Sequence, residues 1–385
     1  MQHIKEEIED LVEENIPPHH RATKTWFHGR FDNPWDTWED RSFADLRRWN
    51  KERRAKNLPR SGHLIHIKDP TPADFLAAFP PVDPDTTALA TPPSTSVQAF
   101  WIGHATVLVQ LHGLTFITDP VFTPRCSPIS FIGPLRVVPP ALTVDTIPHL
   151  DAVLISHSHY DHLSDHCVKA LHAKFGPELK WFVPLGLASW FARRGIRNVV
   201  EMDWWDEVEY KNGVKVAFTP AQHWSMRGVF DRKSTLWGGW AVSGPELRFW
   251  FAGDTGYCPV FKDIGKRLGP FDLCAIPTGA YSPRWFMKTQ HTDPKEAIAI
   301  HKDVKSKRSI AIHCCTWALT DEALDEPVLL LKKLVEEEGL EGDEFVTLRH
   351  GAHIVTAQGV DRNAVSSHLM PVPEIVDSDT FVPAE

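Results

Sequence analysis

VLISHSHYDH, residues 153 to 162, is an apolar run that ends in four metal-binding side chains. Three imidazoles and one carboxylate form a donor set that favours zinc, although other transition metals also accept it. In extended backbone alternate side chains share a face, so His157, His159 and Asp161 converge while His162 points elsewhere. One metal ion could not bind all four. Histidines that gather in a surface loop by chance, the alternative, explain neither this pattern nor its position after an apolar run.

Three further apolar runs each lead to another metal-binding side chain. They are residues 214–218 before His223, residues 249–252 before Asp254 and residues 309–312 before His313. Open α/β folds place their sites beyond the carboxyl ends of strands, so we expect these side chains to meet in one cleft. A catalytic zinc takes three protein ligands and a water. Five histidines and two aspartates therefore predict two metal ions that share one bridging carboxylate.

The ordered ligand set resembles that of the metallo-β-lactamase superfamily, whose members carry it on an αββα sandwich. The resemblance implies an α/β fold of this type, here with an N-terminal extension. Other segments are similar to the family of N-acyl-phosphatidylethanolamine-hydrolysing phospholipase D, and together they span most of residues 24–351. These segments are residues 31–38, 101–106, 118–122, 181–186, 253–259, 279–288 and 290–294.

The resemblance also implies a reaction and a set of roles. The reaction is hydrolysis of N-acyl-phosphatidylethanolamine to phosphatidic acid and an N-acylethanolamine, by attack of a metal-bound hydroxide with two zinc ions per chain. The implied ligands are His157, His159 and His223 for one zinc, Asp161, His162 and His313 for the other, and Asp254 as the bridge.

The catalytic residues expected are Asp161 and His291. The N-acylethanolamine alkoxide is a poor leaving group, and a histidine with an unperturbed pKa of about 6.5 can move protons to it. His291 has a structural alternative, which is to cap a helix that starts near Pro294.

Two more residues are expected to support the site. Asp119 ends the predicted strand 114–118 and resembles an aspartate that orients a ligand by hydrogen bonding; its alternative is a turn residue before Pro120. His104 lies in a Gly-His-Ala-Thr turn, where we favour a structural role over a catalytic one.

Composition excludes several classes of function. Lys plus Arg total 41 against 50 Asp plus Glu, a formal net charge of −9, so we expect no nucleic-acid partner. No apolar run reaches the roughly 18 residues that span a bilayer. The start of the chain shows no secretory or transit pattern, and six cysteines without CxxC spacing fit reduced thiols. We therefore expect a cytoplasmic protein.

We divide the chain into an N-terminal extension and cover (residues 1–95), a catalytic domain (residues 96–360) and a flexible C-terminal tail (residues 361–385). Helices are predicted at residues 164–175, 186–194, 294–302 and 321–338, the last with an amphipathic leucine face.

A phospholipid substrate requires contact with a membrane surface, so we expect peripheral association with intracellular membranes. Apolar residues that could contact lipid are Phe122, Phe131, Ile132, Trp190 and Phe191. Packing inside the protein is the alternative for each of them. The family resemblance is also compatible with a homodimer.

Two other functions use the same sequence features. Another hydrolase of this fold, such as a lactonase acting on a soluble ester, would share every ligand. A lipid-binding scaffold that had lost its metals would not need the complete ligand set that this chain retains.

Overall fold

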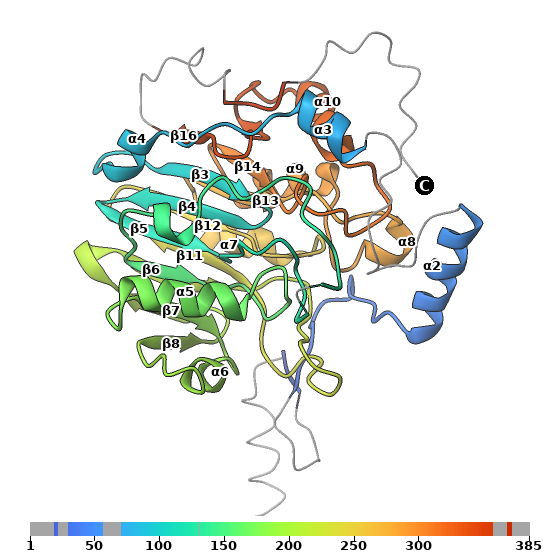
Figure 1. The fold of residues 1–385 in the computed structure, drawn as a ribbon, viewed down its shortest axis with the longest axis horizontal. Helices are drawn as coiled ribbons and strands as arrows, with labels where there is room; N and C mark the ends of the chain where they lie inside the picture. The colour runs from blue at the N-terminus through green and yellow to red at the C-terminus, as the bar shows by residue number, and fades with distance from the viewer. Residues whose placement is uncertain (1–18, 22–29, 57–70, 130, 357–367, 372–385) are drawn as a thin grey trace, which may run out of the picture.

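The computed structural model describes residues 19–21, 30–56, 71–129, 131–356 and 368–371. Two seven-stranded mixed sheets face each other in this part of the chain, with helices on their outer sides (Figure 1). The first sheet has the order β16-β3-β4-β5-β6-β7-β8, and the second has the order β15-β14-β13-β12-β11-β10-β9. The predicted αββα sandwich is confirmed.

The strands are short and almost continuously apolar because most are covered on both faces. The first sheet comprises β3 (Gln98–Gly103), β4 (Thr106–Leu111), β5 (Leu114–Thr118), β6 (Ala152–Leu154), β7 (Lys180–Pro184), β8 (Val199–Met202) and β16 (His353–Val355). The second comprises β9 (Glu207–Glu209), β10 (Lys215–Thr219), β11 (Gly239–Ser243), β12 (Arg248–Phe251), β13 (Leu273–Pro277), β14 (Ser309–Ile312) and β15 (Phe345–Val346).

Helices flank both sheets, and a short ribbon precedes them. The helices are α2 (Phe43–Ala55), α3 (Pro72–Ala78), α4 (Thr86–Ala90), α5 (Asp165–Phe175), α6 (Ala188–Ala192), α7 (Val260–Arg267), α8 (Arg284–Met287), α9 (Pro294–Asp303) and α10 (Glu326–Glu337). The ribbon pairs β1 (His20–Arg21) with β2 (Arg30–Phe31).

The four predicted helices correspond to α5, α6, α9 and α10, with ends set by local chemistry. The Ser164 side chain accepts a hydrogen bond from Cys167 N at the start of α5, and Gly176 ends that helix at φ +76°. Helix α10 begins at Glu326, later than predicted, with Pro327 in its first turn.

Apolar cores hold the layers together. Between the sheets, Trp101 and Trp240 are fully buried, whereas Trp250 lies on the opposite face of the second sheet and packs against Phe261 of α7. Between the first sheet and its outer helices, Val168 and Leu171 of α5 pack with Trp181. Strands β5 to β8 run parallel, as do β12 to β15. In each sheet the carboxyl ends of these parallel strands therefore lie along one edge, and the site is formed at this edge.

The predicted extension and tail lie partly outside the described residues. Within the extension, α2 lies at the periphery of the molecule (Figure 1). Its residue Trp49 packs against Phe286 of α8 and so attaches the helix to the domain. Within the predicted tail, residues 368–371 are described. Leu369 forms an isolated antiparallel β-bridge with Leu348, and Met370 is buried. At least this part of the tail packs against the domain.

Candidate metal centre

The loop that follows β6 carries the four clustered side chains into the space between the two sheets. His223 enters after β10, Asp254 after β12 and His313 after β14. All seven predicted ligands come together there. His313 has φ +60°, a left-handed conformation that turns its side chain back toward the site immediately after the strand.

A first ligand group is made by His157, His159 and His223. His159 Nδ1 lies 2.8 Å from His157 Nε2 and 3.2 Å from His223 Nε2. The other ring nitrogen of His223 lies 2.9 Å from the carbonyl oxygen of Gln290, which can only accept a hydrogen bond. His223 Nδ1 therefore carries the proton, and Nε2 presents a lone pair to the group.

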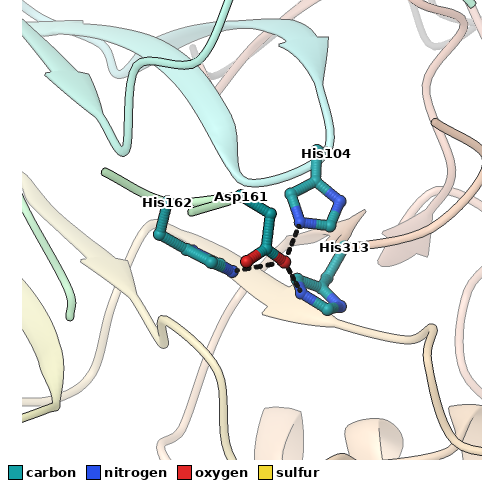
Figure 2. A group of neighbouring side chains, drawn as sticks. All are labelled: His104, Asp161, His162 and His313. Atoms are coloured by element: carbon teal, nitrogen blue, oxygen red, sulfur yellow. Dashed lines mark hydrogen bonds and ion pairs between the residues drawn. The ribbon is translucent and has the colours of Figure 1, made fainter. Parts of the chain in front are cut away.

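A second ligand group is made by Asp161, His162 and His313, and His104 joins it (Figure 2). Asp161 Oδ2 lies 3.4 Å from His162 Nε2 and 3.5 Å from His313 Nε2. His104 Nε2 is nearer, at 3.0 Å from the same oxygen. His104 thus fixes the Asp161 carboxylate. This contact agrees with the supporting role predicted for His104, and the β3 strand before it ends at the same edge as the other runs.

Asp254 lies between the two groups. Its Oδ2 is 3.7 Å from His223 Nε2 in the first group and 3.0 Å from His313 Nε2 in the second. His157 and His162 also lie within 4 Å of this oxygen. This is the position that a carboxylate shared by two metal ions must occupy.

Buried polar atoms that lack hydrogen-bond partners indicate whether these residues are suited to bind a metal ion. Among the described residues, His162 Nε2, His313 Nε2 and Asp254 Oδ1 are buried and have no hydrogen-bond partner. Buried polar atoms without partners are rare, and a cation in their midst would satisfy them. In the first group, His157 Nε2 and His223 Nε2 both face His159 Nδ1, which carries at most one proton, so a cation would satisfy the nitrogens that remain unpaired. The seven residues therefore fit a metal centre.

The electrostatics favour the metal-binding protonation states at His159, His223 and Asp254. Burial lowers the pKa of His159 to about 3 and that of His223 to about 4, so both imidazoles are neutral. Burial opposes ionisation of Asp254, but His162 and His313 hold its pKa well below the ordinary value. Neutral imidazoles and an ionised carboxylate are the forms that bind metal. Despite burial, nearby carboxylates raise the pKa of His162 well above its ordinary value and that of His313 to about 9, so a metal ion would have to displace protons from these two rings.

One buried carboxylate orients ligands of both groups. Asp119 Oδ2 lies 2.6 Å from His162 Nδ1, and it also accepts the hydroxyl of Ser156. The Ser156 hydroxyl in turn lies 2.9 Å from His157 Nδ1. Asp119 thus holds His162 directly and His157 through Ser156, so that each presents Nε2. The sequence interpretation missed Ser156 and Gln290; their only signal was proximity to predicted site residues.

We expect Asp119→Asn to weaken metal binding by about 10- to 100-fold, because a carboxylate that orients a ligand also raises its basicity. Competition with a chromophoric chelator measures this. Asp151→Asn is the matched control: Asp151 is also buried and hydrogen-bonded, but lies just before β6, at the opposite end from the ligands. Equal affinities in the two variants would mean that Asp119 supports only the backbone.

His291 lies beside the ligands. Its Nδ1 is 3.9 Å from Asp254 Oδ2, and its ring centroid is 5.1 Å from that of His223. It does not cap the following helix, because the α9 cap is Asp293, whose side chain accepts from Glu296 N. Burial lowers the pKa of His291 well below its ordinary value. The unperturbed pKa that we assumed for it is therefore wrong, and the ring is neutral.

The structure corrects part of the predicted lipid-contact set. Phe191 is fully buried and packs against Trp181, and Trp190 is also buried. Phe122 is half-buried against the same core. The aromatic side chains of the α6 segment thus face inward, whereas Arg193 is exposed. Phe131 and Ile132 are exposed, Phe131 to 76%. Val229 and Phe230, which the sequence interpretation missed, are exposed to 85% and 88%.

The chain is similar to proteins of a known family. Residues 115–314 match the family described as Beta-lactamase superfamily domain. The N-acyl-phosphatidylethanolamine-hydrolyzing phospholipase D 1 of Caenorhabditis elegans is 48% identical over 264 residues, which are 66% of this chain and 74% of that protein. The mitochondrial N-acyl-phosphatidylethanolamine-hydrolyzing phospholipase D of Saccharomyces cerevisiae is 32% identical over 243 residues, which are 61% of this chain and 51% of that protein.

Solved structures agree on the fold. An isothiocyanate hydrolase from Delia radicum gut bacteria aligns with a TM-score of 0.53 at 17% identity, covering 67% of this chain and 98% of that one. The metallo hydrolase Igni18 from Ignicoccus hospitalis aligns with a TM-score of 0.52 at 19% identity, covering 68% and 98%. These similarities concern the fold alone.

Proposed function

The chain belongs to the Beta-lactamase superfamily and, within it, to the N-acyl-phosphatidylethanolamine-hydrolyzing phospholipase D family, and we propose that it hydrolyses N-acyl-phosphatidylethanolamine to phosphatidic acid and an N-acylethanolamine. The names of the worm and yeast relatives supply the substrate. The position of Asp254 between two ligand groups is the observation that supports this chemistry most directly.

We propose that the cofactor is a pair of zinc ions. His157, His159 and His223 would hold one, Asp161, His162 and His313 the other, and Asp254 both. When bound, two such ions activate water at neutral pH and neutralise charge on the phosphoryl oxygens. The imidazole-rich donor set supports zinc over magnesium or calcium, which prefer oxygen ligands.

The chain's own residues would then position the reacting groups. Asp119, Ser156 and Gln290 keep three imidazoles in the tautomer that presents Nε2. His291 is a candidate to relay a proton to the leaving alkoxide. Because its ring is neutral, it would first accept the proton that the attacking water releases and then pass it on, and its buried Nδ1 has no hydrogen-bond partner among the described residues.

The test is a parallel assay of zinc-loaded protein with N-acyl-phosphatidylethanolamine in mixed micelles and with a soluble lactone. Mass spectrometry should detect phosphatidic acid together with N-acylethanolamine, and a chelator should abolish both. Lactone opening without lipid turnover would overturn the substrate but leave the metal centre. Absence of stoichiometric metal would instead favour a lipid-binding scaffold.

Membrane contact is the second part of the proposal, and exposed apolar side chains near the ligand loops support it. Phe131 and Ile132 belong to a loop whose later residue Val137 donates a backbone hydrogen bond to Thr316, close to His313. Val229 and Phe230 follow Arg227, whose guanidinium donates to the carbonyl of Ser158 in the ligand loop. Both apolar loop tips are thus attached to backbone that carries metal ligands.

Helix α2 adds basic charge to an acidic chain. Arg47, Lys51 and Arg54 are exposed along it, and Phe43 at its start is exposed to 86%. Exposed cations and an exposed aromatic ring on one helix suit the surface of an anionic bilayer. No helix in the described part of the chain is both long and apolar enough to span a membrane. The homodimer stays a prediction.

We expect the double variant Val229→Ser/Phe230→Ser to bind phospholipid vesicles at least about ten-fold more weakly. Insertion of an apolar side chain contributes on the order of 1.5–3 kcal/mol. Vesicle co-sedimentation measures the loss, and turnover of a short-chain, micelle-free substrate should stay unchanged. If vesicle binding is intact in the variant, this loop does not contact the membrane.

A further inference from the structure

A second cluster of metal-binding side chains lies outside the metal centre and shares no residue with it. His19 and His20, at the N-terminal ribbon, converge on Asp203 in the connection between β8 and β9. This connection joins the first sheet to the second. The cluster therefore connects the N-terminal segment to the loop that joins the two sheets of the sandwich.

The two histidines approach different oxygens of the same carboxylate. His19 Nε2 lies 2.6 Å from Asp203 Oδ1, and His20 Nε2 lies 2.7 Å from Asp203 Oδ2. His19 immediately precedes β1, which begins at His20, and the two imidazole rings lie edge to face with their centroids 4.5 Å apart.

Hydrogen bonding alone does not account for this arrangement. His20 Nε2 is shielded from water, yet within the described residues it has no aligned hydrogen-bond partner, despite its distance from the carboxylate. His19 is buried, and its ring packs at a tilt against Trp204 with centroids 4.2 Å apart. A buried, unpartnered nitrogen beside a second imidazole and a carboxylate is a place where a cation gains three donors.

We propose that His19, His20 and Asp203 form a further binding site for a divalent transition metal, with zinc as the ion that this donor set suits. Two imidazoles and one carboxylate are a known three-ligand set for zinc, with a water completing the tetrahedron. The site differs from the metal centre in having only three protein donors, and it binds one ion.

The place of this site in the fold gives the ion a structural role. The ribbon continues into Asn33, whose side-chain amide donates to the carbonyl oxygen of His223 at 2.8 Å. Phe31 N also donates to Lys233 O, on the segment that follows His223. An ion at His19, His20 and Asp203 anchors the segment that supports one ligand of the metal centre.

Metal counting tests the site. Full-length wild-type protein, His20→Ala and His149→Ala are equilibrated with the same buffered free zinc, and bound metal is measured by mass spectrometry. We expect His20→Ala to carry about one zinc ion per chain fewer than wild type. His149→Ala should match wild type, because His149 also pairs with a carboxylate, Asp151, but is exposed and has no second histidine in that cluster.

Diffraction from wild-type crystals grown with zinc provides a measurement that needs no variant to fold. An anomalous peak at the zinc edge among His19, His20 and Asp203 supports the site. Zinc at the metal centre without a peak here would overturn it, as would equal zinc content in wild type and folded His20→Ala. The two locations are seen separately, so failure of either proposal is recognised independently of the other.

Discussion

Asp254→Asn is expected to lower kcat/KM for N-acyl-phosphatidylethanolamine by about 10³-fold or more, the equivalent of roughly 4 kcal/mol of transition-state stabilisation. The substitution keeps the size of the side chain but removes its charge. Asp254 Oδ2 faces nitrogens of both ligand groups, so one change weakens the attraction for both metal ions. Bound zinc should fall together with activity.

The matched control for this variant is Asp272→Asn. Asp272 lies directly before β13, near the opposite end of the second sheet, where it accepts Arg248 N and pairs with Lys307. We expect this variant to retain activity and both metal ions. Wild-type turnover by Asp254→Asn, or loss of turnover with full metal content, would contradict a bridging role.

His291→Ala is expected to lower kcat by about 10²- to 10⁴-fold, the range typical of a general acid or base, while zinc content stays unchanged. The reason is position: the ring lies beside Asp254 and contacts both His223 and His313. Metal analysis and kinetics on the same preparation separate the possible roles.

A fall in zinc content with His291→Ala would show that this residue is a ligand, which its proximity to His223 and Asp254 permits. Unchanged kcat would make it a packing residue. His166→Ala, an exposed histidine in α5, is the control that should change neither quantity.

The convergence of the ligands could be predicted from the sequence because the carboxyl ends of parallel strands in an α/β sheet share one edge. Each apolar run predicted from sequence is a strand, and the polar residue after it reaches the site at that edge. Periodicity also located α5 and α9 to within a residue or so. The predicted fold and family are confirmed by the topology and by the relatives.

The sequence did not reveal which apolar side chains are exposed to solvent. Trp190 and Phe191 lie beside arginines in sequence, as interfacial residues do, yet α6 turns them into the core against Trp181. Val229 and Phe230 are only two apolar residues in a polar stretch, and no periodicity marks them. Burial depends on what packs over a segment, and that is a non-local property.

By itself, the sequence determined the sandwich, the identity of the side chains available to a metal and the edge at which they meet, because these follow from hydrophobic patterning and strand direction. Only the tertiary structure decided how those side chains are held. Asp119 reaches His162 and Ser156, Gln290 reaches His223, and His104 reaches Asp161. Each contact joins separate segments of the chain, and hydrogen-bond geometry over such separations is set by packing rather than by local sequence.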